Sequence, residues 1–63
     1  MSSNEVVIRF CVGERGSRKA VIEMWVAPID VEDIIEEAFR TNGDITLAQV
    51  FEDGEFVIQY ERR

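Results

Sequence analysis

Two segments near the start of the chain alternate in hydrophobicity with a period of two, as the residues of a β-strand do. They run from Glu5 to Val12 and from Lys19 to Ala27, and a polar turn with two glycines separates them. The pattern predicts a β-hairpin in which Arg9 lies opposite Glu23. In the same register, the expected apolar pairs are Val12 with Ala20, Phe10 with Ile22, and Ile8 with Met24.

A helix is predicted after Pro28, which ends the second strand because proline has no amide hydrogen to donate to the ladder. Asp30 is placed to cap the helix, and Ile29 and Ile34 have the spacing of a hydrophobic staple. The pair Asn42-Gly43 predicts a left-handed residue at the helix end. The apolar arc of this helix comprises Val31, Ile34, Ile35, Ala38 and Phe39.

A second hairpin is predicted from Ile45 to Phe51 and from Glu55 to Glu61. Asp53-Gly54 joins the two strands, and this dipeptide tolerates the positive φ angles of a type I′ turn. The expected pairs are Phe51 with Phe56, Gln49 with Ile58, Leu47 with Tyr60, and Val50 with Val57.

The order of elements predicts an α+β fold: one ββαββ domain over residues 1–63, with a frayed end at residues 1–4. We expect a four-stranded, mostly antiparallel sheet with one helix packed on one face. A right-handed crossover through the helix makes the second and third strands parallel, while the strand order stays open.

One helix covers only one face of such a sheet, so the residues on the other face are informative. The face toward the helix is predicted to hold Val6, Ile8, Phe10, Val12, Ala20, Ile22, Met24, Val26, Ile45, Leu47, Phe51, Phe56, Ile58 and Tyr60. The reverse face is predicted to hold Val7, Cys11, Val21, Trp25, Ala48, Val50 and Val57, with Arg9, Glu23, Thr46 and Gln59 among them. A tryptophan surrounded by valines is typical of a binding surface. The alternative is that β-branched residues are there because they suit strands.

The amino-acid composition and net charge exclude several classes of function. The chain has 63 residues, one cysteine, no histidine and a net charge of −6. Without histidine, the usual general base and a Ser-His or Cys-His pair are missing, and Cys11 alone forms neither an intrachain disulfide nor a zinc site. We therefore expect no enzyme, cofactor or metal, and we interpret Cys11 as a packing residue. The negative charge disfavours nucleic acid and membranes as partners. The lack of an apolar span or secretory start favours a cytoplasmic protein, or a mature form whose signal was removed.

Charged clusters give the remaining candidates. Four carboxylates lie on the outer side of the predicted helix and form a partner-binding or merely solvated face: Glu32, Asp33, Glu36 and Glu37. With Glu52, Asp53 and Glu55 they suggest a DNA-mimicking surface. The basic alternative, which would contact phosphate, is the first hairpin loop with Arg15, Arg18 and Lys19, together with Arg62-Arg63.

The segments 21–27 and 30–38, VIEMWVA and DVEDIIEEA, resemble the strand and acidic helix of small bacteriophage proteins that inhibit a host polymerase. The resemblance covers less than half of the chain and implies a small acidic inhibitor. We therefore expect a noncatalytic inhibitor or regulator that occupies a surface of a larger host protein. The alternatives are a homodimer formed through the apolar sheet face and a DNA mimic that blocks a nucleic-acid-binding enzyme.

Overall fold

The structure is a computed structural model that describes residues 5–14 and 16–62. The predicted frayed end at residues 1–4, and the candidate phosphate contacts Arg15 and Arg63, lie outside this part of the chain. The elements in chain order are β1 (Val6–Val12), β2 (Lys19–Val26), the 3₁₀ turn η1 (Pro28–Asp30), α1 (Val31–Thr41), β3 (Ile45–Glu52) and β4 (Glu55–Glu61).

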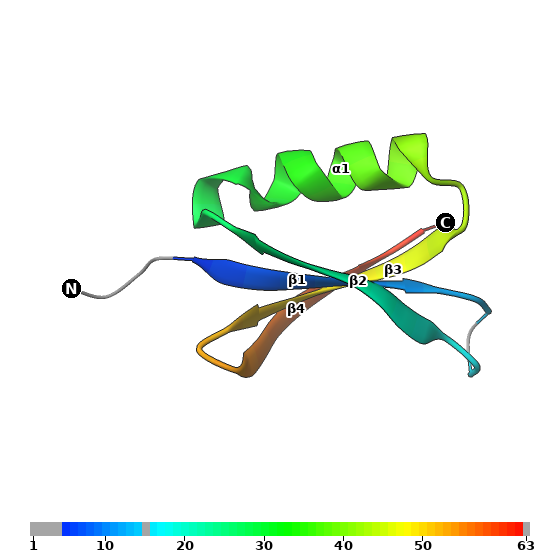
Figure 1. Ribbon diagram of the computed structural model, residues 1–63, viewed down its shortest axis with the longest axis horizontal. Coiled ribbons are helices and arrows are strands. Elements are labelled where there is room, and N and C mark those ends of the chain that lie inside the picture. Colours follow the sequence, from blue (N-terminus) through cyan, green and yellow to red (C-terminus); the bar gives the residue numbers. More distant parts are fainter. Residues whose placement is uncertain (1–4, 15, 63) are drawn as a thin grey trace.

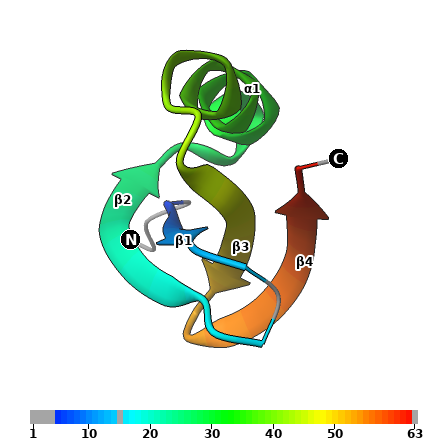
Figure 2. The same cartoon turned by 90° about the vertical axis from the view of Figure 1, so that its right-hand side faces the viewer.

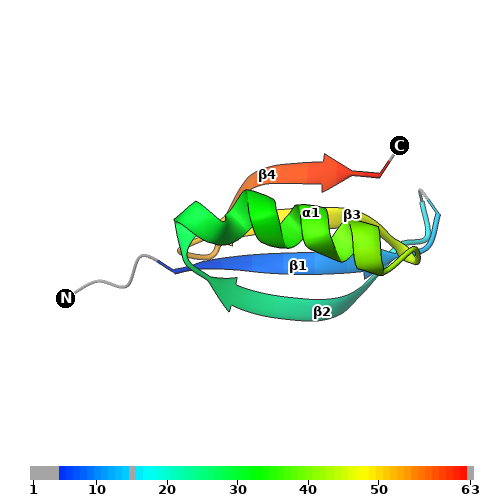
Figure 3. The ribbon, with the colours of Figure 1, turned by 90° about the horizontal axis from the view of Figure 1, so that it is seen from above.

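The four strands form one sheet in the order β2-β1-β3-β4, and every neighbouring pair is antiparallel. The predicted ββαββ α+β fold is thus confirmed. Because β2 and β3 are both antiparallel to β1, they run parallel to each other with β1 between them, as the crossover rule predicts. Seen from above, α1 lies over the central strands β1 and β3, and the edge strands β2 and β4 lie to either side (Figures 1 and 3).

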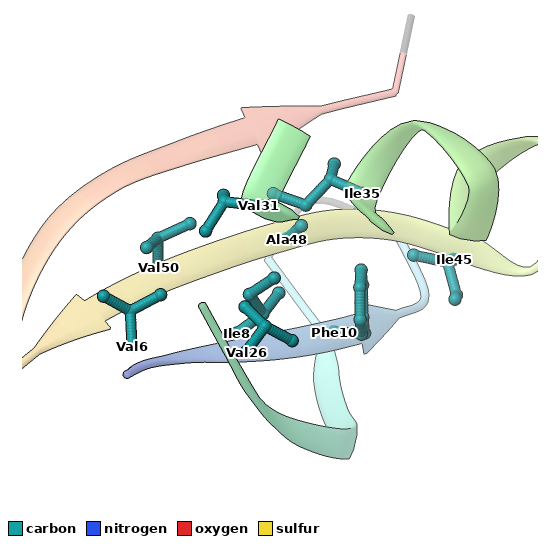
Figure 4. Packing of buried hydrophobic residues seen from close by; sticks show 9 residues of the cluster. All are labelled: Val6, Ile8, Phe10, Val26, Val31, Ile35, Ile45, Ala48 and Val50. Carbon is teal, nitrogen blue, oxygen red and sulfur yellow. The ribbon is translucent and has the colours of Figure 1, made fainter. Parts of the chain in front are cut away.

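The hydrophobic core lies between α1 and the central strands. Its buried members are Val6, Ile8, Phe10, Val26, Val31, Ile35, Ile45, Ala48 and Val50. Figure 4 shows Ala48 and Val50 of β3 on the same side of the sheet as Val31 and Ile35 of α1. Of the predicted helix arc, Val31 and Ile35 are buried and the other three residues are partly buried against the core. The helix therefore packs with the face that its periodicity predicts.

Three β-bulges change the predicted pairing. Arg9 lies opposite Glu23, and the pairs Ile8 with Met24, Phe10 with Ile22 and Phe51 with Phe56 are confirmed. One extra residue in each of β2, β3 and β4 then shifts the register. The extra residues, left without a partner in the ladder, are Val21, Thr46 and Val57. The Thr46 hydroxyl donates to the carbonyl oxygen of Gly13 at 2.7 Å.

These bulges make four predicted pairs wrong. Val12 lies opposite Lys19 instead of Ala20, Gln49 opposite Gln59, Leu47 opposite Glu61, and Val50 opposite Ile58. A shift of one residue also moves side chains to the other face of the sheet.

The bulges also correct the face assignment. Ala48 and Val50, predicted on the reverse face, lie in the core beneath α1. Four residues that were predicted beneath the helix lie on the reverse face: Ala20, Leu47, Phe51 and Phe56. Their partners in the sheet establish this, because Cys11 lies opposite Leu47, Val7 opposite Phe51, and Phe51 opposite Phe56.

Both ends of α1 also differ from the prediction. Asp30 occupies the N-cap position, but its side chain makes no capping hydrogen bond. Ile29 is 87% exposed and therefore forms no hydrophobic staple. The short turn η1 places these residues before the helix in a different geometry from an extended N-cap. At the other end of the helix, neither Asn42 nor Gly43 has a positive φ angle. The predicted left-handed residue therefore does not form there.

Instead, the side chain of Arg62 caps the carboxyl end of α1. Its Nε donates to the carbonyl oxygen of Ile45 at 2.7 Å, and its terminal nitrogen donates to the carbonyl oxygens of Phe39 and Asn42. The guanidinium also lies 5.1 Å from the centre of the Phe39 ring. A cation at the carboxyl end of a helix offsets the negative end of the dipole and satisfies carbonyls without intrahelical partners.

We expect Arg62→Ala to lower the free energy of unfolding by about 1–3 kcal/mol, because charge-assisted hydrogen bonds to several carbonyls are lost together. Chemical denaturation followed by circular dichroism measures this loss. The matched control is Arg40→Ala, which removes an exposed cation from the same helix. Equal stability of the two variants would show that Arg62 does not hold the helix end.

The second hairpin turn agrees with the prediction. Asp53 has a φ of 54° and Gly54 a φ of 81°, as a type I′ turn requires at both central positions. The turn therefore fixes where β3 ends and β4 begins, and it places Asp53 at the edge of the reverse face.

Candidate protein-binding face

The reverse face of the sheet is built from three rows of side chains, each of which crosses all four strands. Residues opposite one another in neighbouring antiparallel strands share a face, so the pairing defines the rows. From β2 to β4, the aromatic row is Trp25, Val7, Phe51 and Phe56; the polar row is Glu23, Arg9, Gln49 and Gln59; and the covered row is Ala20, Cys11, Leu47 and Glu61.

The aromatic row presents three rings on a face that no helix covers. Trp25 is 69% exposed and Phe56 is 53% exposed, whereas Val7 and Phe51 between them are half-buried. The Phe51 and Phe56 rings meet edge to face, with 5.9 Å between their centres. This arrangement holds the two rings in place while both outer ends of the row remain in contact with water.

The polar row is internally paired. Arg9 donates through Nε to Oε2 of Glu23 at 2.9 Å, and its terminal nitrogen lies 2.9 Å from the same oxygen. The Arg9 guanidinium also lies 4.9 Å from the centre of the Phe51 ring. Arg9 therefore links the polar row to the aromatic row and supports Phe51 from one side.

The covered row explains how two apolar residues are buried on a face without a helix. Cys11 and Leu47 are both buried, although neither belongs to the core beneath α1. Arg18, just before β2, forms an ion pair of 2.8 Å with Glu61 near the end of β4. The pair therefore joins the two edges of the sheet near the end at which Cys11 and Leu47 are buried. Figure 2 shows the two edge strands curving at the sides of the sheet.

We expect Arg18→Ala to expose the Cys11 thiol, because the ion pair that joins the two edges of the sheet near Cys11 is removed. The rate of reaction with a thiol reagent such as DTNB should rise about tenfold, since reaction requires an accessible thiolate. The control variant is Arg40→Ala, which removes a cation from α1 on the opposite side of the sheet. An unchanged rate in a folded Arg18→Ala variant would show that the ion pair does not cover Cys11.

A groove of about 510 Å³ crosses the aromatic row at Val7, between Trp25 and Phe51. Its lining includes Val7, Trp25 and Phe51 from the aromatic row and the Arg9 and Glu23 pair from the polar row. Glu5 and the Asp53-Gly54 turn line the remainder of the groove. On the reverse face, the apolar residues of the covered row are therefore buried, whereas the aromatic row is accessible to a partner.

The edge strands expose further apolar side chains. Val21 and Val57, the bulged residues predicted on the reverse face, are both exposed. Ile22 and Met24 of β2 and Ile58 of β4 belong to rows on the helix side, but α1 does not reach far enough to bury them. Apolar exposure therefore continues from the aromatic row onto both edges of the sheet.

Of the five predicted sheet-face contacts, the aromatic row contains Trp25 and Val7, and the edge strands carry Val21 and Val57. Val50 is buried in the core and is not available for contact. Sequence reasoning missed Phe51 because the bulge at Thr46 reverses the faces of the residues that follow it in β3, and it missed Phe56 because the bulge at Val57 separates it from Ile58. The positive φ of the Asp53-Gly54 turn was readable in the sequence, but the bulge beyond it was not.

The acidic candidates lie on the other side of the molecule. Glu32, Asp33, Glu36 and Glu37 are exposed on α1, above the sheet in Figure 1. The turn between β3 and β4, which carries Asp53, lies below the sheet in the same view. The helix therefore provides an acidic face by itself. Of the basic candidates within the described residues, Arg18 and Arg62 bond to groups of their own chain, and Lys19 is exposed.

The described residues contain no group of three or more histidine, cysteine, aspartate or glutamate side chains arranged to hold a metal ion. Within the same residues, no helix has the length and apolar character needed to span a membrane. Comparisons of the chain with known protein families, with curated proteins and with solved structures gave no match.

Proposed function

We propose that this protein is a noncatalytic binding domain that inhibits or regulates a larger protein by occupying part of its surface. The observation that carries the proposal is the exposed aromatic row on the reverse face. Trp25 and Phe56 stand at its two ends, and large aromatic side chains supply much of the binding energy in protein interfaces. A small domain that leaves such a row in water loses hydrophobic stabilisation that a partner restores.

The internal pairing of the neighbouring rows supports the same function. Arg9 is already paired with Glu23, and Arg18 with Glu61, so these charges enter an interface with their partners in place. Burying a charge together with its partner costs less than burying it alone. The reverse face therefore combines apolar anchors with a polar surround, as binding faces of proteins do.

Two alternatives use other surfaces or another partner. The acidic face of α1 supports binding to a basic protein or DNA mimicry, and the sheet face supports a homodimer. The net charge of −6 disfavours the homodimer, because two acidic copies repel each other. We therefore expect the isolated protein to sediment at micromolar concentration as a monomer of 7.3 kDa. A species of twice that mass, lost in Trp25→Glu, would favour the homodimer instead.

The proposal is tested by affinity capture with three immobilised proteins. These are the wild type, Trp25→Ala, and a helix variant in which Glu32, Asp33, Glu36 and Glu37 are converted to their amides. A specific partner should be retained by the wild type and by the helix variant but not by Trp25→Ala. Retention by Trp25→Ala with loss in the helix variant would overturn the assignment of the reverse face and favour the acidic face.

A further inference from the structure

The groove that crosses the aromatic row at Val7 is narrow, and its width limits which side chains of a partner fit into it. Val7 forms its floor, with Trp25 on one neighbouring strand and Phe51 on the other. Two strand spacings separate Trp25 from Phe51, so their Cα atoms stand about 10 Å apart. Between two side-chain walls, that width admits a single layer of atoms. The groove therefore suits one extended side chain better than a bulky cluster.

The charges around the groove are unequal at its two ends. Toward the polar row, the Arg9 guanidinium is matched by Glu23 and lies against Phe51. Toward the hairpin turn, the lining carries the carboxylates of Asp53 and Glu5. Among the described residues that line the groove, Arg9 is the only cation. Its charge is balanced within the groove, so the field at the turn end is negative.

We infer that the occupant of this groove is a partner segment that presents an arginine or lysine beside an apolar residue. The methylene stem of the basic side chain lies over Val7 between the rings, and its charged group reaches Asp53. Long basic side chains combine an apolar stem with a charged tip, and a cation is attracted both to aromatic faces and to a carboxylate. This inference rests on the proposed function and adds the chemistry of the partner to it.

A second copy of the chain suits the groove less well. Each copy carries a net charge of −6, so a second copy brings more negative charge to a groove that is already negative at the turn end. Three of the five cations among the described residues, Arg9, Arg18 and Arg62, are engaged with carboxylates or carbonyl oxygens of their own chain. Charge complementarity therefore favours a basic partner.

A random dodecapeptide library displayed on phage tests the inference against the folded protein. Peptides enriched on the wild type should carry an arginine or lysine next to an apolar residue more often than the unselected library does. The best peptide is then synthesised and titrated, with fluorescence of Trp25, the only tryptophan of the chain, as the readout. Emission should change on binding, because the indole lines the groove.

The decisive variant is Asp53→Asn, because asparagine retains the preference for positive φ that the turn requires and loses only the charge. We expect Asp53→Asn to weaken binding of the peptide about tenfold, in proportion to the loss of one charge-assisted contact. Glu36→Gln on α1 removes the same charge far from the groove and should leave the affinity within about twofold.

The outcomes separate this inference from the proposed function. Enriched peptides without an excess of basic residues, or equal binding to Asp53→Asn and the wild type, would overturn the basic occupant. If those peptides still fail to bind Trp25→Ala, the reverse face remains a binding surface with a different preference. If no peptide is enriched on the wild type over Trp25→Ala, both the occupant and the proposed face are wrong.

Discussion

Replacing Phe10 with alanine is expected to unfold the protein. Phe10 is 1% exposed and lies at the centre of the core between α1 and the sheet. Truncation of a buried phenylalanine costs about 3–5 kcal/mol through lost burial and the cavity left behind. A domain of 63 residues has a free energy of unfolding of only about 3–9 kcal/mol, so this loss removes much or all of its stability. Circular dichroism and urea denaturation measure it.

Phe56→Ala provides the matched control, because it removes the same ring from an exposed position in the aromatic row. We expect it to lower the free energy of unfolding by less than about 1.5 kcal/mol, mainly through the lost contact with Phe51. If Phe56→Ala destabilised the fold as much as Phe10→Ala does, the side of the sheet that carries the core would be wrongly assigned.

Trp25→Ala is expected to weaken binding of the captured partner about 30- to 900-fold, while the fold stays intact. The indole stands at the exposed end of the aromatic row, and truncation of a central aromatic anchor costs about 2–4 kcal/mol of binding energy. The loss should appear mainly as faster dissociation, which surface plasmon resonance measures directly. The free energy of unfolding should change by less than about 1 kcal/mol, because the side chain is already in water.

Ile29→Ala tests whether any exposed apolar residue has the same effect. Among the residues that the structure describes, Ile29 is the most exposed large apolar side chain, and it lies in η1, outside the rows of the reverse face. Its removal should leave the affinity within about twofold. A loss as large as that of Trp25→Ala would indicate that the partner binds near the start of α1 rather than across the aromatic row.

The first hairpin was predictable because several signals agree on one register. Ile8, Arg9 and Phe10 find apolar or oppositely charged partners on β2 only in the observed alignment. The order of strands was not predictable, since a right-handed crossover fixes the direction of β3 and leaves its position in the sheet free. The antiparallel pairing of β1 with β3 places two apolar strands at the centre, beneath α1.

The content of the reverse face was only partly predictable. Val7 lies in β1, which carries no extra residue, and Trp25 lies in the part of β2 after the bulge at Val21, so an unbroken period of two places both on the correct face. The bulge at Thr46 reverses the faces of Val50 and Phe51, and the bulge at Val57 reverses the face of Phe56, although neither bulge changes the local hydrophobic pattern. A bulge depends on the partner strand and on twist, so one strand's sequence does not reveal it.

The end of α1 was mispredicted for a similar reason. Asn42-Gly43 is a good local signal for a left-handed cap, but Arg62 from the end of β4 reaches the same carbonyls. This contact joins residues twenty positions apart, and local propensity yields to tertiary hydrogen bonds of this kind. The same contact ties the end of β4 to the helix.

The central claim is that a partner binds across the aromatic row. Cross-saturation NMR on the complex with the captured partner tests it most directly, because saturation passes from the partner only to protons in contact with it. We expect the largest signal losses at the Trp25 indole N–H and at the amides of Val7, Phe51 and Phe56, with little change at Glu32 and Glu36. Signal loss confined to α1, with Trp25 unaffected, would contradict the account.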